Sequence, residues 1–326
     1  MGQINFTERK MIEKMLKQGM GVRAIGRTLN RGHSTISDEI RKNKSPYERW
    51  YDAESAQYRH ERRQMNKGNK SKLARKEKLK KHVIEKLEED WSPEQIAGEL
   101  RERCGMTIIS HETIYQFIYS EEGRQLKLWL HLRIKHKPER RKRSTRKSRK
   151  GLIIPERISI HKRTEEAAER KITGHLETDS MIFSQQRPIV SVQVDRASQK
   201  CAITKLENKT ALETKYALVR AIEEEYASVK TVTFDNGTEN VLHTEIRDIY
   251  EISTHFCDPY CSWQKGLVEE INGLIRQYLP RHINMNQITQ DDIYEIQEKL
   301  NNRPRKSLNY KTPNQIYVSL IESGRF

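Results

Sequence analysis

The chain has 326 residues, and basic residues outnumber acidic ones. Lys and Arg number 61 and Asp and Glu 45, which gives a formal net charge of +16 at pH 7. A chain of this length is expected to form two or three compact units. With no run of about 18 apolar residues, no signal-peptide core and only 4 cysteines, a membrane span, a secreted protein and a disulfide scaffold are all disfavoured. We therefore expect a cytoplasmic protein.

The positive charge is concentrated in the first half of the chain. Residues 1–150 hold 38 Lys/Arg and 20 Asp/Glu, a net of +18 (38 − 20), whereas residues 151–326 hold 23 and 25, a net of −2 (23 − 25). A basic half favours a polyanion as partner, through phosphate contacts and the release of counterions. The alternative is a basic, solvated surface with no polyanion partner.

Residues 6–43 have the pattern of three short helices in a helix-turn-helix arrangement. Thr7 and Ser34 are the expected caps of the first and third helices, and Gly19 ends the first. The apolar residues that these helices would bury are Ile12, Met15, Leu16, Val22, Ile25, Leu29, Ile36 and Ile40. The outward positions of the third helix, which are candidates for DNA contact, are His33, Thr35, Ser37, Asp38 and Arg41. An ordinary three-helix bundle is the alternative.

A second helical unit is predicted at residues 83–132, after a first domain at 1–58 and a basic linker or solvated helix at 59–82. Ser92 and Gln95 form a capping-box pattern around Pro93, and Ser110 can cap the following helix. Two short helices joined through a glycine suggest another helix-turn-helix, with dimerisation as the alternative role. Its outward candidates for DNA contact are His111, Glu112, Thr113 and Gln116.

A strongly basic segment follows the second helical unit. From Arg133 to Lys150 the chain carries eleven Lys/Arg and one acidic residue, Glu139. Such a segment cannot bury a core, and we predict a basic arm and linker at 133–171 that folds onto phosphates. The arm residues that we expect to contact DNA are Arg140, Arg141, Lys142 and Arg143.

Residues 172–326 alternate between strand-like and helix-like patterns, which indicates a mixed α/β sheet. The predicted strands are 189–194, 201–206, 229–234 and 252–256. Residues 190, 192 and 194 would form the buried face of a half-buried strand. Predicted helices begin at a capping box around Thr210 and cover 241–250 and 264–278. The first of these helices would bury a stripe formed by Leu212, Tyr216, Val219, Ile222 and Tyr226.

Three acidic residues of this region, Asp179, Asp235 and Glu269, are the candidate catalytic residues. Three carboxylates could hold two divalent cations, which together activate an oxygen nucleophile and stabilise a leaving oxygen at a phosphodiester. Asp235 follows a predicted strand and could equally serve only a turn. Glu269, Gly273 and Arg276 fall on one face of a predicted helix, where Arg276 could contact phosphate or form a plain surface pair with Glu269.

Several longer motifs accompany these acids. They lie at residues 91–97, 110–115, 234–237, 258–260, 263–266, 272–280, 302–306 and 308–313. With these motifs, and with 33 residues between Asp235 and Glu269, the chain resembles the IS thirty family of bacterial insertion-sequence transposases, part of the wider DDE group. The resemblance covers most of the chain.

The resemblance implies a multidomain protein: helix-turn-helix units followed by a ribonuclease-H-like catalytic domain at 172–326. It implies that Asp179, Asp235 and Glu269 bind two Mg²⁺ ions, with Mn²⁺ able to substitute, and that Arg276 is the basic residue of the site. It also implies that the protein binds double-stranded DNA at terminal inverted repeats and cuts and joins strands there. Because two ends must be joined, we expect a homodimer or a higher oligomer on DNA.

Three residues near the acids depart from the family pattern. The family usually has Trp at the position of Leu176, Gly at that of Thr178 and Asn at that of Val268. These departures leave the acids intact, but they motivate a second hypothesis: a catalytically inactive DNA-binding regulator that keeps the transposase fold.

Overall fold

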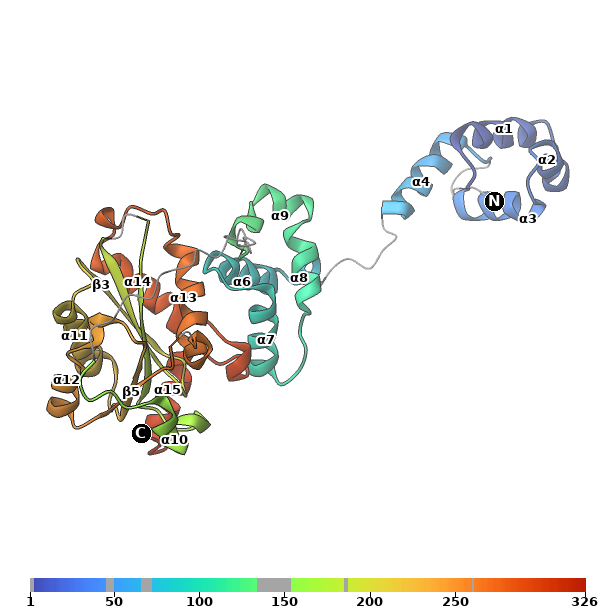
Figure 1. The fold of residues 1–326 in the computed structure, drawn as a ribbon. Coiled ribbons are helices and arrows are strands. Elements are labelled where there is room, and N and C mark those ends of the chain that lie inside the picture. The colour runs from blue at the N-terminus through green and yellow to red at the C-terminus, as the bar shows by residue number, and fades with distance from the viewer. Residues whose placement is uncertain (1–2, 45–49, 66–71, 134–153, 185–186, 260) are drawn as a thin grey trace. The chain divides into compact units, whose positions relative to one another are not determined.

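The computed structural model describes residues 3–44, 50–65, 72–133, 154–184, 187–259 and 261–326. The chain divides into two compact units, Met1–Ser71 and Lys72–Phe326, whose elements are drawn in Figure 1. No helix within the described ranges is long and apolar enough to cross a membrane. The predicted basic-arm residues 140–143 lie outside the described residues.

The first unit is helical and contains the predicted helix-turn-helix. Helices α1 (Phe6–Lys17), α2 (Val22–Thr28) and α3 (His33–Asn43) confirm the three predicted helices. A further helix, α4 (Ala53–Met65), packs against α1 and α3. The buried apolar core of the unit is Ile4, Ile12, Ile25, Ile36, Tyr51 and Ala56. Residue 58, the predicted end of the first domain, lies inside α4. The compact unit instead extends to Ser71.

The caps of these helices differ from the prediction. Asn5, not Thr7, caps α1: the Asn5 side chain accepts from the Glu8 N–H at 2.9 Å, and the Glu8 carboxylate accepts from the Asn5 N–H at 2.9 Å. This reciprocal pair satisfies two free donors at the helix start. The N-cap of α3 is Gly32, without a side-chain bond, so Ser34 lies inside the helix.

Glycine is required in the tight connection between α2 and α3. A Cβ at Gly26 would lie 2.9 Å from the carbonyl oxygen of Arg31 and 3.3 Å from the Cα of His33. The Arg31 N–H also donates to the Gly26 carbonyl at 2.8 Å. This close approach of the chain at Arg31 to Gly26 determines how the turn leads from α2 into α3.

The second unit begins with helices α5 (Lys72–Arg75), α6 (Glu77–Glu88), α7 (Pro93–Cys104), α8 (His111–Ile118) and α9 (Glu121–Gln125). The Ser92–Gln95 capping box and the Ser110 cap are confirmed. Residues 59–65 belong to α4, and α5 and the start of α6 cover most of 72–82, so the described part of 59–82 is largely helical, as the solvated-helix alternative has it. The buried core of this helical part is Leu73, Val83, Leu87, Trp91, Ile96, Leu100, Ile109, Ile114, Phe117, Ile118 and Leu128.

This helical part is packed onto the C-terminal loop of the same unit. A Cβ at Gly98 would lie 2.1 Å from the Tyr310 ring, so only glycine lets α7 approach that ring. The Gln95 amide donates to the Pro304 carbonyl at 2.8 Å. The loop at 302–313 therefore holds α7 against the sheet domain, and residues 83–132 are not an isolated domain.

The centre of the second unit is a five-stranded mixed sheet. Its strands are β1 (His175–Met181), β2 (Ile189–Asp195), β3 (Cys201–Leu206), β4 (Thr231–Phe234) and β5 (Ser253–Phe256). The order is β3-β2-β1-β4-β5, in which β1, β2 and β3 pair antiparallel and β4 runs parallel to both β1 and β5. The predicted mixed sheet is confirmed, and its topology is that of a ribonuclease-H-like fold.

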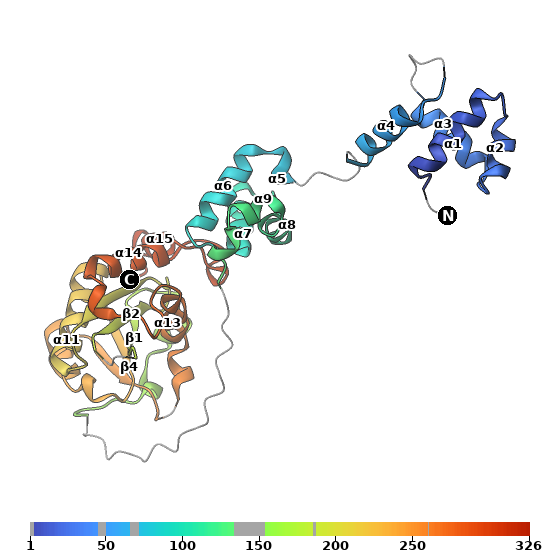
Figure 2. The ribbon, with the colours of Figure 1, turned by 90° about the horizontal axis from the view of Figure 1, so that it is seen from above.

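Helices cover both faces of the sheet. Helices α13 (Gly266–Tyr278) and α14 (Gln290–Asn301) pack on one face, and α11 (Ala211–Arg220) and α12 (His243–Tyr250) on the other. Figure 2 shows β2, β1 and β4 between α11 and α13. Every residue of β2 is consequently buried, which corrects the prediction of a half-buried strand. A last helix, α15 (Pro313–Glu322), adds Tyr317 to the α11 side.

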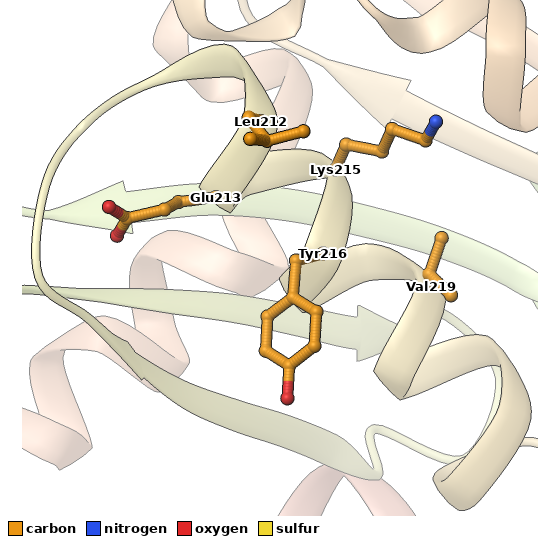
Figure 3. A pocket seen from close by; sticks show the side chains of 5 residues that line it. All are labelled: Leu212, Glu213, Lys215, Tyr216 and Val219. Carbon is orange, nitrogen blue, oxygen red and sulfur yellow. The ribbon is translucent and has the colours of Figure 1, made fainter.

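The predicted buried stripe from Leu212 to Tyr226 is wrong in its first half. Leu212 is 70% and Tyr216 61% exposed, and with Val219 they line a surface groove (Figure 3). The helix instead turns small residues such as Ala217 toward the sheet, which permits close packing. A π-helical turn at Ala221–Glu225 then changes the phase, so the last two members of the stripe, Ile222 and Tyr226, are buried as predicted.

Candidate active site

Two of the three predicted acids lie at the carboxyl ends of neighbouring parallel strands. Asp179 belongs to β1, and Asp235 directly follows β4. The paired residues of β1 and β4 run from His175 and Thr231 to Glu177 and Thr233, so Asp179 and Asp235 each lie two residues beyond the last pair. Asp179 faces α13, because its Oδ2 accepts from the Asn272 amide of that helix. The two aspartates therefore lie near the same end of the β1–β4 pair.

The Asp235 carboxylate also holds its own loop. Its Oδ1 accepts from the Gly237 N–H at 3.2 Å and from the Asn240 amide at 2.8 Å. The turn function considered for Asp235 is thus present, and it coexists with the placement beside Asp179. The local bonds fix the direction of the side chain at the edge of the sheet.

A buried lysine lies against the two aspartates. Lys265 is 5% exposed, and its Nζ donates to the Thr178 carbonyl at 2.8 Å and to Asp179 Oδ1 at 3.3 Å. Burial disfavours the ammonium charge, but the charges of Asp179 and Asp235 outweigh burial and raise the pKa of Lys265 above its usual value. The lysine therefore remains charged beside the two acids.

Helix α13 carries Glu269 and meets β1 through two polar contacts. The Asn272 amide donates to Asp179 Oδ2 at 2.8 Å. The Val268 N–H, at the start of α13, donates to the buried carboxylate of Glu177 at 3.2 Å. The Glu269 side chain is exposed and has no hydrogen-bond or ion-pair partner within the described part of the chain. It lies one helical turn before Asn272, which touches Asp179 directly.

The three acids do not form a ready three-ligand metal group. Among the described residues, no set of three or more His, Cys, Asp or Glu side chains is arranged to hold a metal ion. The structure brings Asp179 and Asp235 together and leaves Glu269 on the neighbouring helix. Assembly of the third ligand with the first two stays a prediction.

Arg276 lies on α13 but not against Glu269. Its guanidinium donates to the Ile182 carbonyl at 2.9 Å and covers the Phe183 ring at 4.6 Å. No ion pair joins Arg276 to Glu269 in the described part of the chain. The surface pair considered from the sequence is therefore not formed. A phosphate contact by Arg276 remains a prediction.

The residues that depart from the family pattern are packed in the interior. Leu176 is fully buried on the face of β1 opposite to Asp179, and Val268 is fully buried in the core beneath α13. Thr178 is 5% exposed, and its hydroxyl lies 3.4 Å from the Gln193 amide. Among the described residues, no hydrogen bond joins any of these three side chains to the acids.

Sequence reasoning missed Lys265, Asn272 and Glu177. Asn272 follows Glu269 by three residues, a helical spacing that could have identified it. Lys265 lies within the motif at 263–266, but nothing in its spacing indicated a role at the site, and Glu177 lies outside the motifs.

The predicted DNA-contact positions are accessible on their helices. His33, Ser37 and Arg41 are exposed on α3, and Thr35 is half-buried there. Asp38 forms ion pairs with Arg41 at 2.7 Å and with Lys42 at 3.0 Å. On α8, His111, Glu112 and Gln116 are exposed and Thr113 is half-buried. The outward faces are thus as predicted, and DNA contact itself stays a prediction.

Known proteins are similar to this chain over nearly its whole length. A helix-turn-helix domain family matches residues 3–43. The transposase for insertion sequence element IS4351 from Bacteroides fragilis is 36% identical over 319 residues, 97% of this chain and 96% of that protein. Transposase InsI for insertion sequence element IS30A from Escherichia coli (strain K12) is 36% identical over 98% of this chain and 84% of its own. The catalytic core of BIV integrase matches 46% of the chain and 97% of that core, at 18% identity and a TM-score of 0.38.

Proposed function

Because the chain belongs to the IS thirty (IS30) family of insertion-sequence transposases, we propose that it binds the terminal inverted repeats of an insertion sequence and cuts and joins DNA strands there. The observation that carries the catalytic part is the placement of Asp179 and Asp235 at neighbouring strand ends. Acids that share one edge of a sheet can bind a common phosphodiester site.

We propose that Asp179, Asp235 and Glu269 hold divalent cations, with Mg²⁺ as the natural ion and Mn²⁺ as a substitute. Carboxylate oxygens are the ligands that Mg²⁺ prefers, and Glu269 has no competing partner in the described part of the chain. Bound ions supply the charge that activates the attacking oxygen and stabilises the leaving oxygen. The protein's own contribution is to orient these carboxylates, through Asn272 on Asp179 and through Gly237 and Asn240 on Asp235.

We assign reading of the DNA bases to α3, since its exposed face lies in a helix-turn-helix. Replacing Thr35 or Arg41 by alanine is expected to change the preferred sequence at one or two base pairs, each worth about 1–3 kcal/mol. Selection of bound duplexes from a randomised repeat measures this preference. Arg23→Ala, which removes an exposed arginine from α2, is the matched control and should leave the preferred sequence unchanged. An unaltered preference in both Thr35 and Arg41 variants would refute the assignment.

We propose that the basic arm binds phosphates without regard to sequence. Neutralising Arg140, Arg141, Lys142 and Arg143 together should weaken binding to all duplexes and flatten the salt dependence, by roughly 0.9 in the log–log slope for each phosphate that the arm no longer neutralises. Titration at several salt concentrations measures the slope, with a specific and a scrambled duplex side by side. A slope equal to that of the unmodified protein would contradict this role.

The alternative of an inactive regulator rests on the unusual residues near the acids. The burial of the Leu176 and Val268 side chains in the two apolar cores favours the active enzyme. Joining of a pre-cut, labelled repeat end to plasmid DNA distinguishes the two functions. Joined product that depends on a divalent ion supports the transposase, whereas tight end binding without any joining supports the regulator. Because joining requires two ends, we also propose that the active form is at least a dimer on DNA.

A further inference from the structure

Lys265 is the most unusual side chain at the candidate site. It precedes the first residue of α13, and its ammonium is buried against β1 with 5% of the residue exposed. A buried ammonium is costly unless its charge is paired and its N–H groups find acceptors. Both conditions are met here, because Nζ donates to the Thr178 carbonyl and to Asp179 Oδ1.

The charges around Lys265 explain why a cation is present at this position. Two carboxylates at neighbouring strand ends repel each other, and their repulsion is stronger at a partly buried site than in water. Lys265 supplies one positive charge to this pair, through its contact of 3.3 Å with Asp179 Oδ1. Asn272 engages the second oxygen of Asp179, so both oxygens of that carboxylate have protein partners.

We infer that Lys265 is a positioning residue that neutralises the Asp179–Asp235 pair before metal binds and lowers the affinity for metal by competing with it. The inference rests on the proposed function, since it concerns the same two acids. An ammonium beside Asp179 occupies an oxygen that a divalent cation also requires. A metal ion must therefore displace the Lys265 ammonium from Asp179, or bind close to it despite the repulsion between the two positive charges. The site is thereby held in shape without metal and binds metal less tightly than two free aspartates would.

A purely structural function for Lys265, joining α13 to β1, would give a different result. That function predicts loss of stability on substitution and no gain in metal affinity. Competition predicts loss of stability without metal together with tighter metal binding. The metal dissociation constant therefore separates the two explanations, and it does so without any measurement of strand cleavage.

The test uses the full chain with three substitutions. Lys265→Met removes the charge and keeps much of the apolar stem, and Lys265→Arg keeps a charge. Lys200→Met is the matched control, because Lys200 is half-buried and pairs with a different acid, Glu225, at 3.3 Å. Binding of Mn²⁺ is measured by calorimetric titration, and thermal unfolding is followed in EDTA and in saturating Mg²⁺.

We expect Lys265→Met to bind Mn²⁺ about tenfold more tightly than the unmodified protein. Its unfolding midpoint should be lower in EDTA and should rise more on adding Mg²⁺. The dissociation constants of Lys265→Arg and Lys200→Met should stay within about twofold of the unmodified value. Equal or weaker Mn²⁺ binding by Lys265→Met would overturn the inference while leaving the proposed metal site intact. Absence of Mn²⁺ binding by the unmodified protein would reject the metal site and the inference with it.

A variant that fails to fold without metal would still be informative. If Lys265→Met is unfolded in EDTA, the double variant Asp179→Asn with Lys265→Met is expected to fold, because it removes the carboxylate left without its partner. Recovery of a cooperative thermal transition supports the neutralising function. A double variant that is as unstable as the single one would show that the lysine acts through packing alone, which overturns the inference.

Discussion

Replacing Asp235 by asparagine is expected to lower the rate of strand cleavage by about a thousandfold or more while leaving the affinity for DNA ends within about twofold. Asparagine keeps an oxygen that can accept from the Gly237 N–H and the Asn240 amide, so the loop should keep its shape. The change removes one negative charge from the acid pair at the strand ends. Single-turnover cleavage of a labelled repeat end, with a binding titration of the same duplex, measures both quantities.

Asp248→Asn is the matched control for this experiment. Asp248 lies on α12 and pairs with Arg247 at 2.8 Å, so its substitution removes an aspartate of the same domain without touching β1 or β4. Its cleavage rate should stay within about twofold of the unmodified protein, since exposed ion pairs contribute little to stability. Cleavage by Asp235→Asn within tenfold of the unmodified rate would remove Asp235 from the catalytic residues.

Replacing Arg9 by methionine is expected to destabilise the first unit by about 3–5 kcal/mol, because a buried carboxylate then loses its charged partner. Arg9 is 1% and Glu39 8% exposed, and Arg9 Nε lies 2.8 Å from Glu39 Oε1. The same carboxylate oxygen accepts from Asn43 at 2.7 Å and from Tyr51 at 3.0 Å. The loss is comparable to the whole stability of a small domain. Specific binding of the repeat should therefore be lost.

The double variant Arg9→Met with Glu39→Leu is the control that tests the cause. Removing both charges leaves no unpaired ion, and replacing a buried ion pair with apolar residues is often neutral. We expect the double variant to recover a substantial part of the stability that the single variant loses. Arg23→Met, at an exposed position of α2, should have almost no effect. Differential scanning calorimetry measures the transition, and an unchanged transition in Arg9→Met would contradict a stabilising ion pair.

Apolar spacing was sufficient to predict the three helices of the helix-turn-helix unit, but it gave no prediction for α14 or α15. Residues such as Ile12, Ile25 and Ile36 recur at helical spacing, and α1, α2 and α3 bury them as expected. The caps were harder to predict, because several polar residues near a helix start can each serve. Asn5 caps the helix in place of Thr7 because only Asn5 lies three residues before Glu8, which completes a capping box.

The prediction that Leu212 and Tyr216 of α11 are buried was wrong for a different reason. Leu212 and Tyr216 recur at helical spacing, but so do the residues that α11 actually buries. These are Thr214, Ala217 and Leu218. Spacing alone cannot say which of two faces meets the sheet. The smaller side chains allow closer packing, and the π-helical turn at Ala221–Glu225 then interrupts the period.

The sequence was enough to propose the three acids of the candidate site, but not the residues that hold them in place. Asp235 was recognisable because an acid follows a strand, but its place beside Asp179 depends on β4 pairing with β1, which no local pattern specifies. The burial of Lys265 likewise depends on contacts between α13 and β1. Residue spacing alone also did not predict how Glu269 lies relative to the two aspartates. In the described part of the chain the three acids do not form a metal-binding group.

Cleavage by the unmodified full chain tests the central claim most directly. The protein is incubated with a labelled duplex that carries a terminal inverted repeat, in Mg²⁺ or in EDTA, and the strands are separated on a denaturing gel. We predict a nick at the repeat end in Mg²⁺ and intact strands in EDTA, with the duplex bound in both. Binding of the repeat without any nick in Mg²⁺ or Mn²⁺ would contradict the assignment of this chain as an active transposase.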